Sequence, residues 1–271
     1  MGIAMHMRLR SVSRETFAPG QRLAVLRADT PGIFPGPILL ADATLLPGVG
    51  AVLTRPVGDG RLRVLGRFRW PGPAGSVPGI EGCWVQSLDR LEVDTGPETW
   101  SATKCGYSLA WVTLSDKGYA GLREDQAGPR IAQLVGDALE LAHTQGFLLP
   151  DDPGRLRALL AELALEQGFD LILTTGGTGV APRDTTPETT LSLIEKRLPG
   201  METAMLQAAL LKTGHAVISR AVVGTLGQSL IINLPGSPKA VQENLGALLP
   251  ALAHALAKLQ GDPADCAAQH S

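Results

Sequence analysis

The sequence predicts two parts: a small β-rich domain over residues 1–95 and an α/β domain over residues 108–262, with a mostly parallel sheet flanked by helices. The first part contains short alternating apolar runs between glycines and prolines, a pattern typical of strands joined by tight turns. In the second part, short apolar runs alternate with longer segments of helical periodicity, which indicates parallel strands joined by crossover helices. The intervening residues 96–107 are polar and rich in turn formers, and they are expected to form a linker.

The first part has several segments with the length and composition of strands. They are residues 21–27, 38–41, 51–55, 61–68, 84–88 and 91–93. Gly58, Asp59 and Gly60 stand between the third and fourth of these, where a tight hairpin turn is needed. The pattern predicts a barrel or a sandwich of about five to seven strands.

Few residues of the first part suggest chemistry. Cys83 has no histidine near it in the sequence, and buried inert cysteines outnumber reactive ones. Arg61, Arg63 and Arg67 alternate along one predicted strand, which favours a solvated face over an anion-binding one. Two roles stay open for this domain: a partner that resembles the sulfur-carrying MOSC domains and uses Cys83, or a purely structural or docking module.

The second part alternates between buried strands and helices. Apolar runs predict strands at residues 108–114, 147–149, 170–175, 219–223 and 229–234. Apolar residues at helical spacing predict helices at residues 125–144, 153–167, 187–197, 201–213 and 239–260. Residues 263–271 offer nothing to bury and are expected to be a disordered tail.

The stretch DLILTTGGTGVAPRDTTPE, residues 170–188, contains the clearest functional signal. Glycines follow the strand directly, and their lack of a Cβ lets an anionic group approach the backbone N–H groups. Arg183 and Asp184 then precede a helix start with Pro187 and Glu188 in its first turn. This order is typical of a site for a phosphorylated ligand. A glycine-rich turn after a strand is also a common connector, so the other loops must decide.

Polar loops follow the other predicted strands, and all of them are expected at one edge of the sheet, because loops after parallel strands emerge on the same side. They contain Ser115 and Asp116, Asp151 and Asp152, and residues 235–239. Carboxylates beside a phosphate-binding loop would repel the phosphate unless a divalent cation lies between them. Mg²⁺ binds through one or two carboxylates together with phosphate oxygens, so Asp151 and Asp184 are candidates to hold it over a nucleoside triphosphate. The sequence has no GxxxxGK[ST] motif, which excludes a P-loop enzyme.

The composition excludes several other classes of protein. The net charge is −2 and only 18% of residues are charged, so nothing suggests a basic surface for nucleic acid or an anionic membrane. The three cysteines are scattered, which argues against a disulfide framework or a zinc site and favours a reducing cytoplasm. Neither a signal peptide nor an apolar run of about twenty residues is apparent, so we expect a soluble protein.

Several motifs occur together in the second part: LTTGGTGVAPRDTTPETT, VTLSDKGYAG, DQAGPRI, LLPDD, VISR and LIINLPGSPKA. In kind and spacing they resemble the MogA and gephyrin G-domain family of molybdenum-cofactor biosynthesis. The resemblance implies a domain that forms homotrimers and transfers AMP from Mg-ATP to the terminal phosphate of molybdopterin, with release of pyrophosphate. The two aspartates that the family requires fall on Asp151 and Asp184, which would bind or orient Mg²⁺.

The resemblance also implies a set of ligand-binding residues. Thr175, Gly176, Gly177, Thr178 and Gly179 match the segment that holds the nucleotide phosphates, with the amides of Gly176 and Gly177 as the donors. The other matching positions are Ser115, Asp116, Ser219, Asn233, Pro235 and Gly236, with Ser219 on the pterin side.

Two functions follow from this resemblance. The first is the molybdopterin adenylyltransferase, whose partners would be ATP, molybdopterin and other enzymes of the pathway. The second is a non-catalytic molybdopterin-binding or scaffold trimer. Asp151 and Asp184 favour the enzyme, because an inactive copy has no chemical need for either carboxylate.

Overall fold

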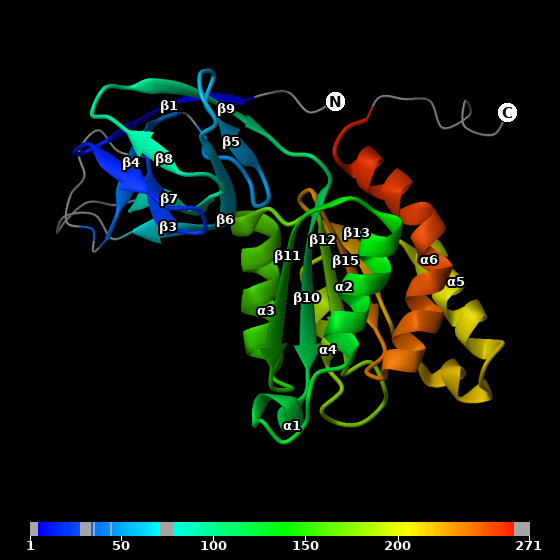
Figure 1. Cartoon of the computed structure of the whole chain (residues 1–271). Coiled ribbons are helices and arrows are strands. Elements are labelled where there is room, and N and C mark those ends of the chain that lie inside the picture. Colours follow the sequence, from blue (N-terminus) through cyan, green and yellow to red (C-terminus); the bar gives the residue numbers. More distant parts are fainter. Residues whose placement is uncertain (1–4, 28–33, 35, 44, 71–78, 263–271) are drawn as a thin grey trace, which may run out of the picture. The chain divides into compact units, whose positions relative to one another are not determined.

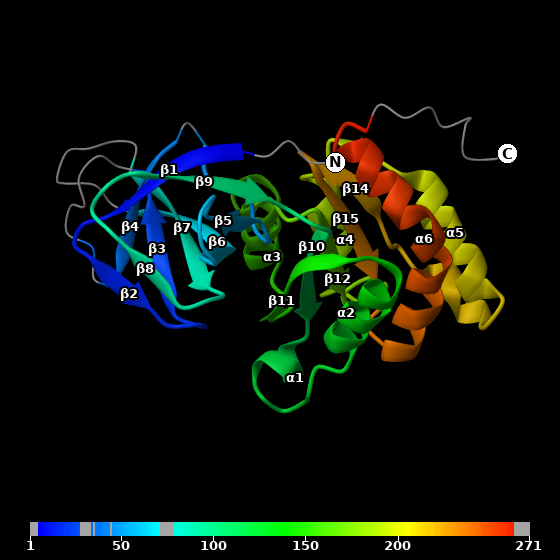
Figure 2. The same cartoon turned by 45° about the horizontal axis from the view of Figure 1, so that its top comes forward.

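The computed structural model describes residues 5–27, 34, 36–43, 45–70 and 79–262, and the chain divides into two compact units, Met1–Gly106 and Tyr107–Ser271. The first unit is a closed barrel with strand order β1-β4-β3-β7-β6-β5-β9, accompanied by a two-stranded sheet of β2 and β8 (Figures 1 and 2). Its strands are β1 Met5–Ser11, β2 Glu15–Phe17, β3 Arg22–Leu26, β4 Ile38–Asp42, β5 Val52–Thr54, β6 Arg61–Trp70, β7 Ile80–Ser87, β8 Leu91–Val93 and β9 Glu98–Thr103. Of the two predicted architectures for the first part, a barrel or a sandwich, the barrel is therefore confirmed. The tail expected at residues 263–271 lies outside the described residues.

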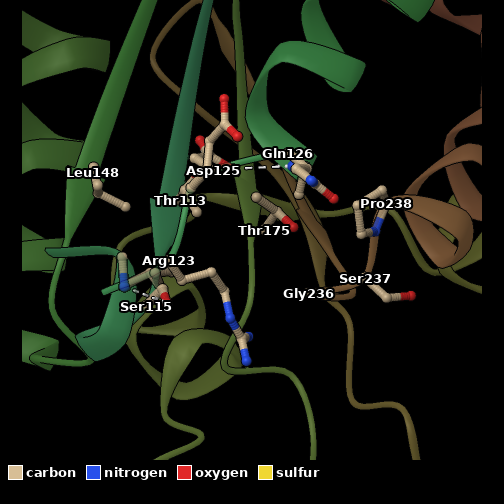
Figure 3. Close-up of a pocket in the computed structure, with 14 residues that line it drawn as sticks. Thr113, Ser115, Arg123, Asp125, Gln126, Leu148, Thr175, Gly236, Ser237 and Pro238 are labelled. Atoms are coloured by element: carbon tan, nitrogen blue, oxygen red, sulfur yellow. Dashed lines mark hydrogen bonds between the residues drawn. The ribbon is translucent and has the colours of Figure 1, made fainter. Parts of the chain in front are cut away.

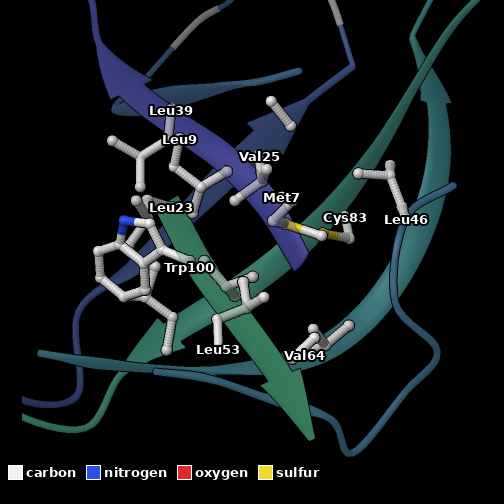
Figure 4. Packing of buried hydrophobic residues seen from close by; sticks show 14 of the residues in the cluster. Met7, Leu9, Leu23, Val25, Leu39, Leu46, Leu53, Val64, Cys83 and Trp100 are labelled. Carbon is white, nitrogen blue, oxygen red and sulfur yellow. The ribbon is translucent and has the colours of Figure 1, made fainter. Parts of the chain in front are cut away.

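Alternation of apolar and polar residues places the barrel core. In β1, Met7 and Leu9 are buried while His6 and Arg8 are exposed, as expected for successive side chains on opposite faces of a strand. Figure 4 shows such side chains from several strands meeting inside the barrel. The predicted hairpin is also present: Gly58 has φ +88°, and the Arg55 N–H donates to the Gly60 carbonyl at 3.1 Å between the antiparallel strands β5 and β6.

Strand β9 occupies most of the segment expected to be a linker, so that expectation is wrong for residues 98–103. This strand pairs with β1 on one side and β5 on the other, and so it closes the barrel. Trp100 and Ala102 are buried in the core between polar residues. The polar positions made the segment look like a turn-rich connection, whereas its pairing partners are distant in the sequence.

The arginine-rich strand β6 does not present a uniform stripe. Arg61 is exposed and paired with Asp89 at 2.9 Å, whereas Arg63 and Arg67 are half-buried. The hydrogen bond and charge of Asp89 raise the pKa of Arg61 above its ordinary value. A register shift between Val64 and Gly66 breaks the simple alternation on which the sequence prediction relied.

Cys83 lies on β7 inside the barrel, where its side chain is fully buried beside Met7 (Figure 4). Burial in apolar surroundings raises the pKa of its thiol to about 12. Because the thiolate is the nucleophile, a thiol with this pKa is inert at neutral pH.

We therefore expect Cys83 to resist a thiol reagent in the native protein and to react once urea unfolds the chain. The assay is spectrophotometric thiol counting in a Cys266→Ser background, where the exposed Cys105 serves as the internal control. Rapid native labelling of both thiols would show that the barrel opens readily.

The second unit contains a six-stranded sheet with order β11-β10-β12-β15-β14-β13. The first four strands in this order are parallel, β14 pairs antiparallel with β15, and β13 pairs antiparallel with β14. Strands and helices are β10 Tyr107–Leu114, α1 Asp116–Tyr119, α2 Ala127–Ala138, β11 Leu141–Leu149, α3 Pro153–Ala161, β12 Leu171–Thr175, α4 Thr186–Leu191, β13 Lys196–Arg197, α5 Pro199–Leu210, β14 Val223–Leu226, β15 Ser229–Leu234 and α6 Pro238–Leu259. A π-helical turn, Glu162–Gln167, follows α3, and a 3₁₀ helix, Gly214–Ile218, follows α5.

Helices cover both faces of this sheet. Helices α2, α5 and α6 pack together over one face, and α3 and α4 lie on the other (Figures 1 and 2). Successive residues of β12 are fully buried, because helices cover each side. Among the described helices, none has both the length and the apolar character that a membrane span requires.

Two helices end earlier in the structure than the sequence predicted. The helix expected at residues 125–144 ends at Ala138, and residues 141–149 form the whole of edge strand β11. The exposed middle of this strand lacks the continuous apolar run that marks a central strand. The helix expected at residues 187–197 ends at Leu191, because the chain turns to pair with β14 through a bond from Glu195 N–H to the Thr225 carbonyl.

The strand expected at residues 219–223 is also wrong. Strand β14 begins only at Val223 and runs to Leu226, and its pairing with β15 is closed by a turn in which Gly227 has φ +57°. Residues 219–222 instead form a connection that follows the 3₁₀ helix. This connection contains Ser219, a predicted ligand-binding residue.

Candidate functional site

The loops that follow β10, β12 and β15 meet at the carboxyl edge of the sheet. The Gly176 N–H donates to the Leu234 carbonyl at 3.2 Å, and the Thr175 hydroxyl donates to the Pro235 carbonyl at 2.7 Å. A Cβ added to Gly176 would collide with the carbonyl oxygen of Leu114, at the end of β10. Segments distant in the sequence are thus packed backbone against backbone.

The glycine loop, residues 176–179, takes a shape that requires glycine. Gly176 has φ +103° and Gly177 has φ +64°, both in the region that L side chains rarely adopt. Thr186, the first residue of α4, donates its hydroxyl to the Gly176 carbonyl at 2.9 Å and its N–H to the Gly177 carbonyl at 3.2 Å. Because the Gly176 N–H is already bonded to Leu234, the amide of Gly177 remains the better anion donor of the expected pair.

Arg183 joins three of the loops. Its Nη2 atom donates to Asp116 Oδ1 at 2.9 Å and to the Asp151 carbonyl at 3.2 Å. The Asp116 and Asp151 loops also bond reciprocally: the Asp151 N–H donates to Asp116 Oδ1 at 3.1 Å, and the Asp116 N–H donates to Asp151 Oδ2 at 3.3 Å. The carboxylate of Asp116 is therefore occupied by a structural network.

Asp184 sits in a tight turn held by Arg220. Its Oδ2 atom accepts the Ala181 N–H at 2.8 Å, and its carbonyl accepts Arg220 Nη2 at 2.5 Å. Arg220 Nε donates to the Gly179 carbonyl at 2.8 Å, and Nη1 pairs with Glu188. One guanidinium therefore bridges both ends of the segment from Gly179 to Asp184.

A cavity of about 570 Å³ opens at this edge of the sheet (Figure 3). Predicted site residues in its lining are Ser115, Thr175 and Gly236. Its wall also contains Ser237, from the predicted loop of residues 235–239. The sequence analysis did not assign the other polar lining residues to the site: Thr113, Arg123, Glu124, Asp125 and Gln126. Asp125 was detectable within the motif DQAGPRI, but its role needed the structure.

Asp125 fixes the start of α2 at the cavity wall. Its Oδ1 atom accepts the N–H groups of Ala127 and Gly128 at 3.1 and 2.9 Å, and its Oδ2 atom accepts the Thr113 hydroxyl at 2.7 Å. These bonds cap the first turn and tie it to β10. Asp125 therefore shapes the cavity, and its carboxylate is occupied.

A second cavity of about 410 Å³ holds Ser219, so this residue lies apart from the lining of the first cavity. Its other polar lining residues are Glu188, Arg197, Glu202, Thr203, Arg220 and Asn244. Arg220 thus lines this cavity while holding the loop that carries Asp184.

Asn233, a predicted ligand-binding residue, is enclosed in the protein interior with no exposed surface. Its Nδ2 atom donates to the hydroxyls of Thr174 and Thr190 at 2.9 Å each, which ties β15 to β12 and α4. Thr178, also predicted as a ligand residue, is 6% exposed, and its carbonyl accepts the Arg220 N–H at 3.1 Å.

The predicted metal ligands fit a cation that is held mainly by its substrate. Within the described ranges, no group of three or more His, Cys, Asp and Glu side chains could hold a metal ion. Mg²⁺ needs only one or two carboxylates when phosphates and waters complete its shell. Asp151 and Asp184 each bond a backbone N–H through Oδ2, and their Oδ1 atoms accept no hydrogen bond from the described residues.

Comparison with known proteins places the second unit in one family. The family model described as "Probable molybdopterin binding domain" matches residues 110–254. Gephyrin from Dictyostelium discoideum is 39% identical over 161 residues, covering 56% of this chain and 22% of that protein. Molybdopterin adenylyltransferase from Haemophilus influenzae is 41% identical over 138 residues, covering 51% of this chain and 70% of that protein.

Solved structures agree with these relatives. The molybdopterin biosynthesis enzyme MoaB from Thermus thermophilus is 42% identical with a TM-score of 0.53, covering 58% of this chain and 98% of that one. A MogA structure is 38% identical with a TM-score of 0.53, covering 56% of this chain and 99% of that one. The α/β fold expected from the sequence is therefore the fold of MoaB and MogA, and the chain belongs, through residues 110–254, to the family of molybdopterin-binding domains of molybdenum-cofactor biosynthesis.

Proposed function

We propose that this chain is a molybdopterin adenylyltransferase, which transfers AMP from ATP to the terminal phosphate of molybdopterin. The observation that carries the proposal is the loop from Gly176 to Asp184, which contacts the Asp151 loop through Arg183. This loop directly follows Thr175, which lines the cavity of about 570 Å³. The relatives named molybdopterin adenylyltransferase, at 37–41% identity, support the same activity.

In the proposed reaction, an oxygen of the molybdopterin phosphate attacks the α-phosphorus of ATP. A new P–O bond forms, the bond between the α-phosphorus and its bridging oxygen breaks, and pyrophosphate leaves with the electron pair. The protein's task is positioning, because such transfers need little covalent chemistry from the enzyme. The amide of Gly177 orients a phosphate oxygen, and Asp184 and Asp151 would hold Mg²⁺. When bound, Mg²⁺ neutralises charge that develops on the phosphates.

We assign the nucleotide to the cavity of about 570 Å³ and the pterin to the one of about 410 Å³. Both volumes are typical of sites for small molecules. Arg123 and the start of α6 at Ser237 favour an anionic ligand in the first cavity, although Glu124 and Asp125 also line it. The second contains Ser219, for which the family resemblance implies a position on the pterin side.

The decisive experiment incubates the purified protein with molybdopterin, ATP and MgCl₂, and follows pyrophosphate release together with the mass of the pterin product. We expect a pterin that is heavier by one adenylyl group and that disappears when Mg²⁺ is omitted. Binding of both ligands without any product would instead assign the chain to the non-catalytic molybdopterin-binding class.

We further propose that the chain acts as a homotrimer in the cytoplasm. The end of α5 and the following 3₁₀ helix expose Leu210, Leu211, Val217 and Ile218, and such apolar patches are typical of protein interfaces. Light scattering should therefore give three times the 28.4 kDa mass of the chain. A monomeric mass at assay concentrations would remove the trimer from the proposal.

For the first unit we propose a structural or docking role. The burial of Cys83 and its raised pKa support this role over sulfur transfer. Cofactor yield in cells that carry Cys83→Ser should equal that of the wild type, and a loss of yield from a stably folded variant would restore the sulfur-transfer role.

A further inference from the structure

We propose that Arg220 is a positioning residue, which fixes the loop from Gly179 to Asp184 and so sets where the Asp184 carboxylate lies. The proposal rests on the function assigned above and extends it to a residue that does not itself bind the metal. Arg220 is far from Asp184 in the sequence, and only the fold brings them together.

The contacts of Arg220 use each nitrogen of its guanidinium group. Nε donates to the Gly179 carbonyl at 2.8 Å, Nη2 donates to the Asp184 carbonyl at 2.5 Å, and Nη1 pairs with Glu188 on α4. The Arg220 backbone N–H adds a bond to the Thr178 carbonyl at 3.1 Å. One residue therefore holds the glycine loop at its end, the turn after it and the following helix.

Local bonds then transmit this restraint to the Asp184 carboxylate. The Asp184 N–H donates to the Ala181 carbonyl at 2.9 Å, and the Ala181 N–H donates to Asp184 Oδ2 at 2.8 Å. A Cβ at position 179 would lie 2.7 Å from the same Oδ2 atom, so the carboxylate rests against Gly179. Because the carboxylate packs on the segment that Arg220 brackets, a shift of this segment moves the carboxylate. Misplacement of a reacting group by about 1 Å can cost roughly 100-fold in rate.

Lysine cannot replace Arg220, because an ammonium group is a single point and cannot span two carbonyls and a carboxylate. Arg183 offers the opposite case. Its side-chain bonds to the described residues all come from one nitrogen, Nη2, so a lysine can retain part of that interaction. We therefore expect substitution by lysine to be tolerated better at Arg183 than at Arg220.

The test compares steady-state kinetics of Arg220→Lys, Arg183→Lys and the control Arg157→Lys, an exposed position on α3. We expect Arg220→Lys to lower kcat by about 100-fold. Arg183→Lys should lose less than about tenfold, and Arg157→Lys should match the wild type. Equal, small losses in all three variants would overturn the proposal.

A double-mutant comparison separates positioning from general destabilisation. In an Asp184→Asn background, Arg220→Lys should cause no further loss of kcat, because the group it positions is already disabled. A full additional loss would show that Arg220 acts through another route. If Arg220→Lys fails to fold, Glu188→Gln weakens the same guanidinium network from its exposed side and should lower kcat by about tenfold.

A binding measurement distinguishes this proposal from the proposed reaction itself. Calorimetry with ATP, in the presence and absence of Mg²⁺, should show that Arg220→Lys loses the Mg²⁺-dependent gain in affinity and keeps the Mg²⁺-independent part. If Arg220→Lys shows this change in ATP affinity but the wild-type protein itself has no turnover, the positioning role of Arg220 is retained and the transferase activity is refuted. Normal turnover in Arg220→Lys would do the reverse.

Discussion

Asp184→Asn is expected to lower kcat by at least about 100-fold while the protein keeps its fold. An asparagine oxygen can still accept the Ala181 N–H that Oδ2 of Asp184 accepts at 2.8 Å, and the Asp184 main chain stays bonded to Arg220. The second carboxylate oxygen, however, becomes an amide nitrogen, which is neutral and donates hydrogen bonds, so it cannot bind Mg²⁺. Initial rates of pyrophosphate release measure the loss, and thermal unfolding checks the fold.

Asp152→Asn is the matched control for this variant. Asp152 caps α3 by accepting the Arg155 N–H at 2.9 Å, and asparagine caps a helix about as well as aspartate. We therefore expect unchanged rates and an unchanged unfolding midpoint. Full activity in Asp184→Asn would exclude Asp184 from the metal site, and equal losses in both variants would point to a general effect of removing a negative charge.

Gly176→Ala is expected to lower the free energy of unfolding of the second unit by about 3 kcal/mol. The backbone at this position has φ +103°, which strains any residue with a Cβ. The new methyl group would also meet the Leu114 carbonyl oxygen, a backbone atom that cannot rotate away as a side chain can. Because the described helices all belong to the second unit, urea unfolding followed by circular dichroism at helical wavelengths measures the loss.

Gly246→Ala is the control, and it should raise the free energy of unfolding where Gly176→Ala lowers it. Gly246 lies within α6, and a Cβ added there meets no atom within 4 Å. Alanine in a helix interior is favoured over glycine, so we expect a gain of about 0.5–1 kcal/mol. A loss below about 1 kcal/mol for Gly176→Ala would show that the loop relaxes, and the packing of β10 against the glycine loop would then be less rigid than described.

The order of elements in the second unit was largely predictable because apolar periodicity is a local property. Strands β10, β12 and β15 are central and covered by helices, so their sequences are continuous apolar runs. Edge strand β11 and the two short antiparallel strands lack that signal, because their pairing partners, not their composition, decide their structure. The closing strand β9 of the barrel was missed for the same reason.

In the candidate site, too, the features that depend on local sequence were predictable and those that depend on distant neighbours were not. The motif from Thr175 to Asp184 marked the glycine loop, since only glycine tolerates its backbone torsions. The burial of Asn233, the occupied amide of Gly176 and the placement of Ser219 in a separate cavity were not predictable, because each depends on neighbours from other loops.

The sequence by itself therefore determined the α/β class of the second unit, the loop that carries Asp184 and the family to which it belongs, because these follow from local periodicity and from residue types at short spacing. Tertiary structure alone decided that Arg183 joins the Asp116 and Asp151 loops and that Arg220 holds the Asp184 turn. The physical reason is that hydrogen bonds form between groups that the fold brings within about 3 Å, whatever their separation along the chain.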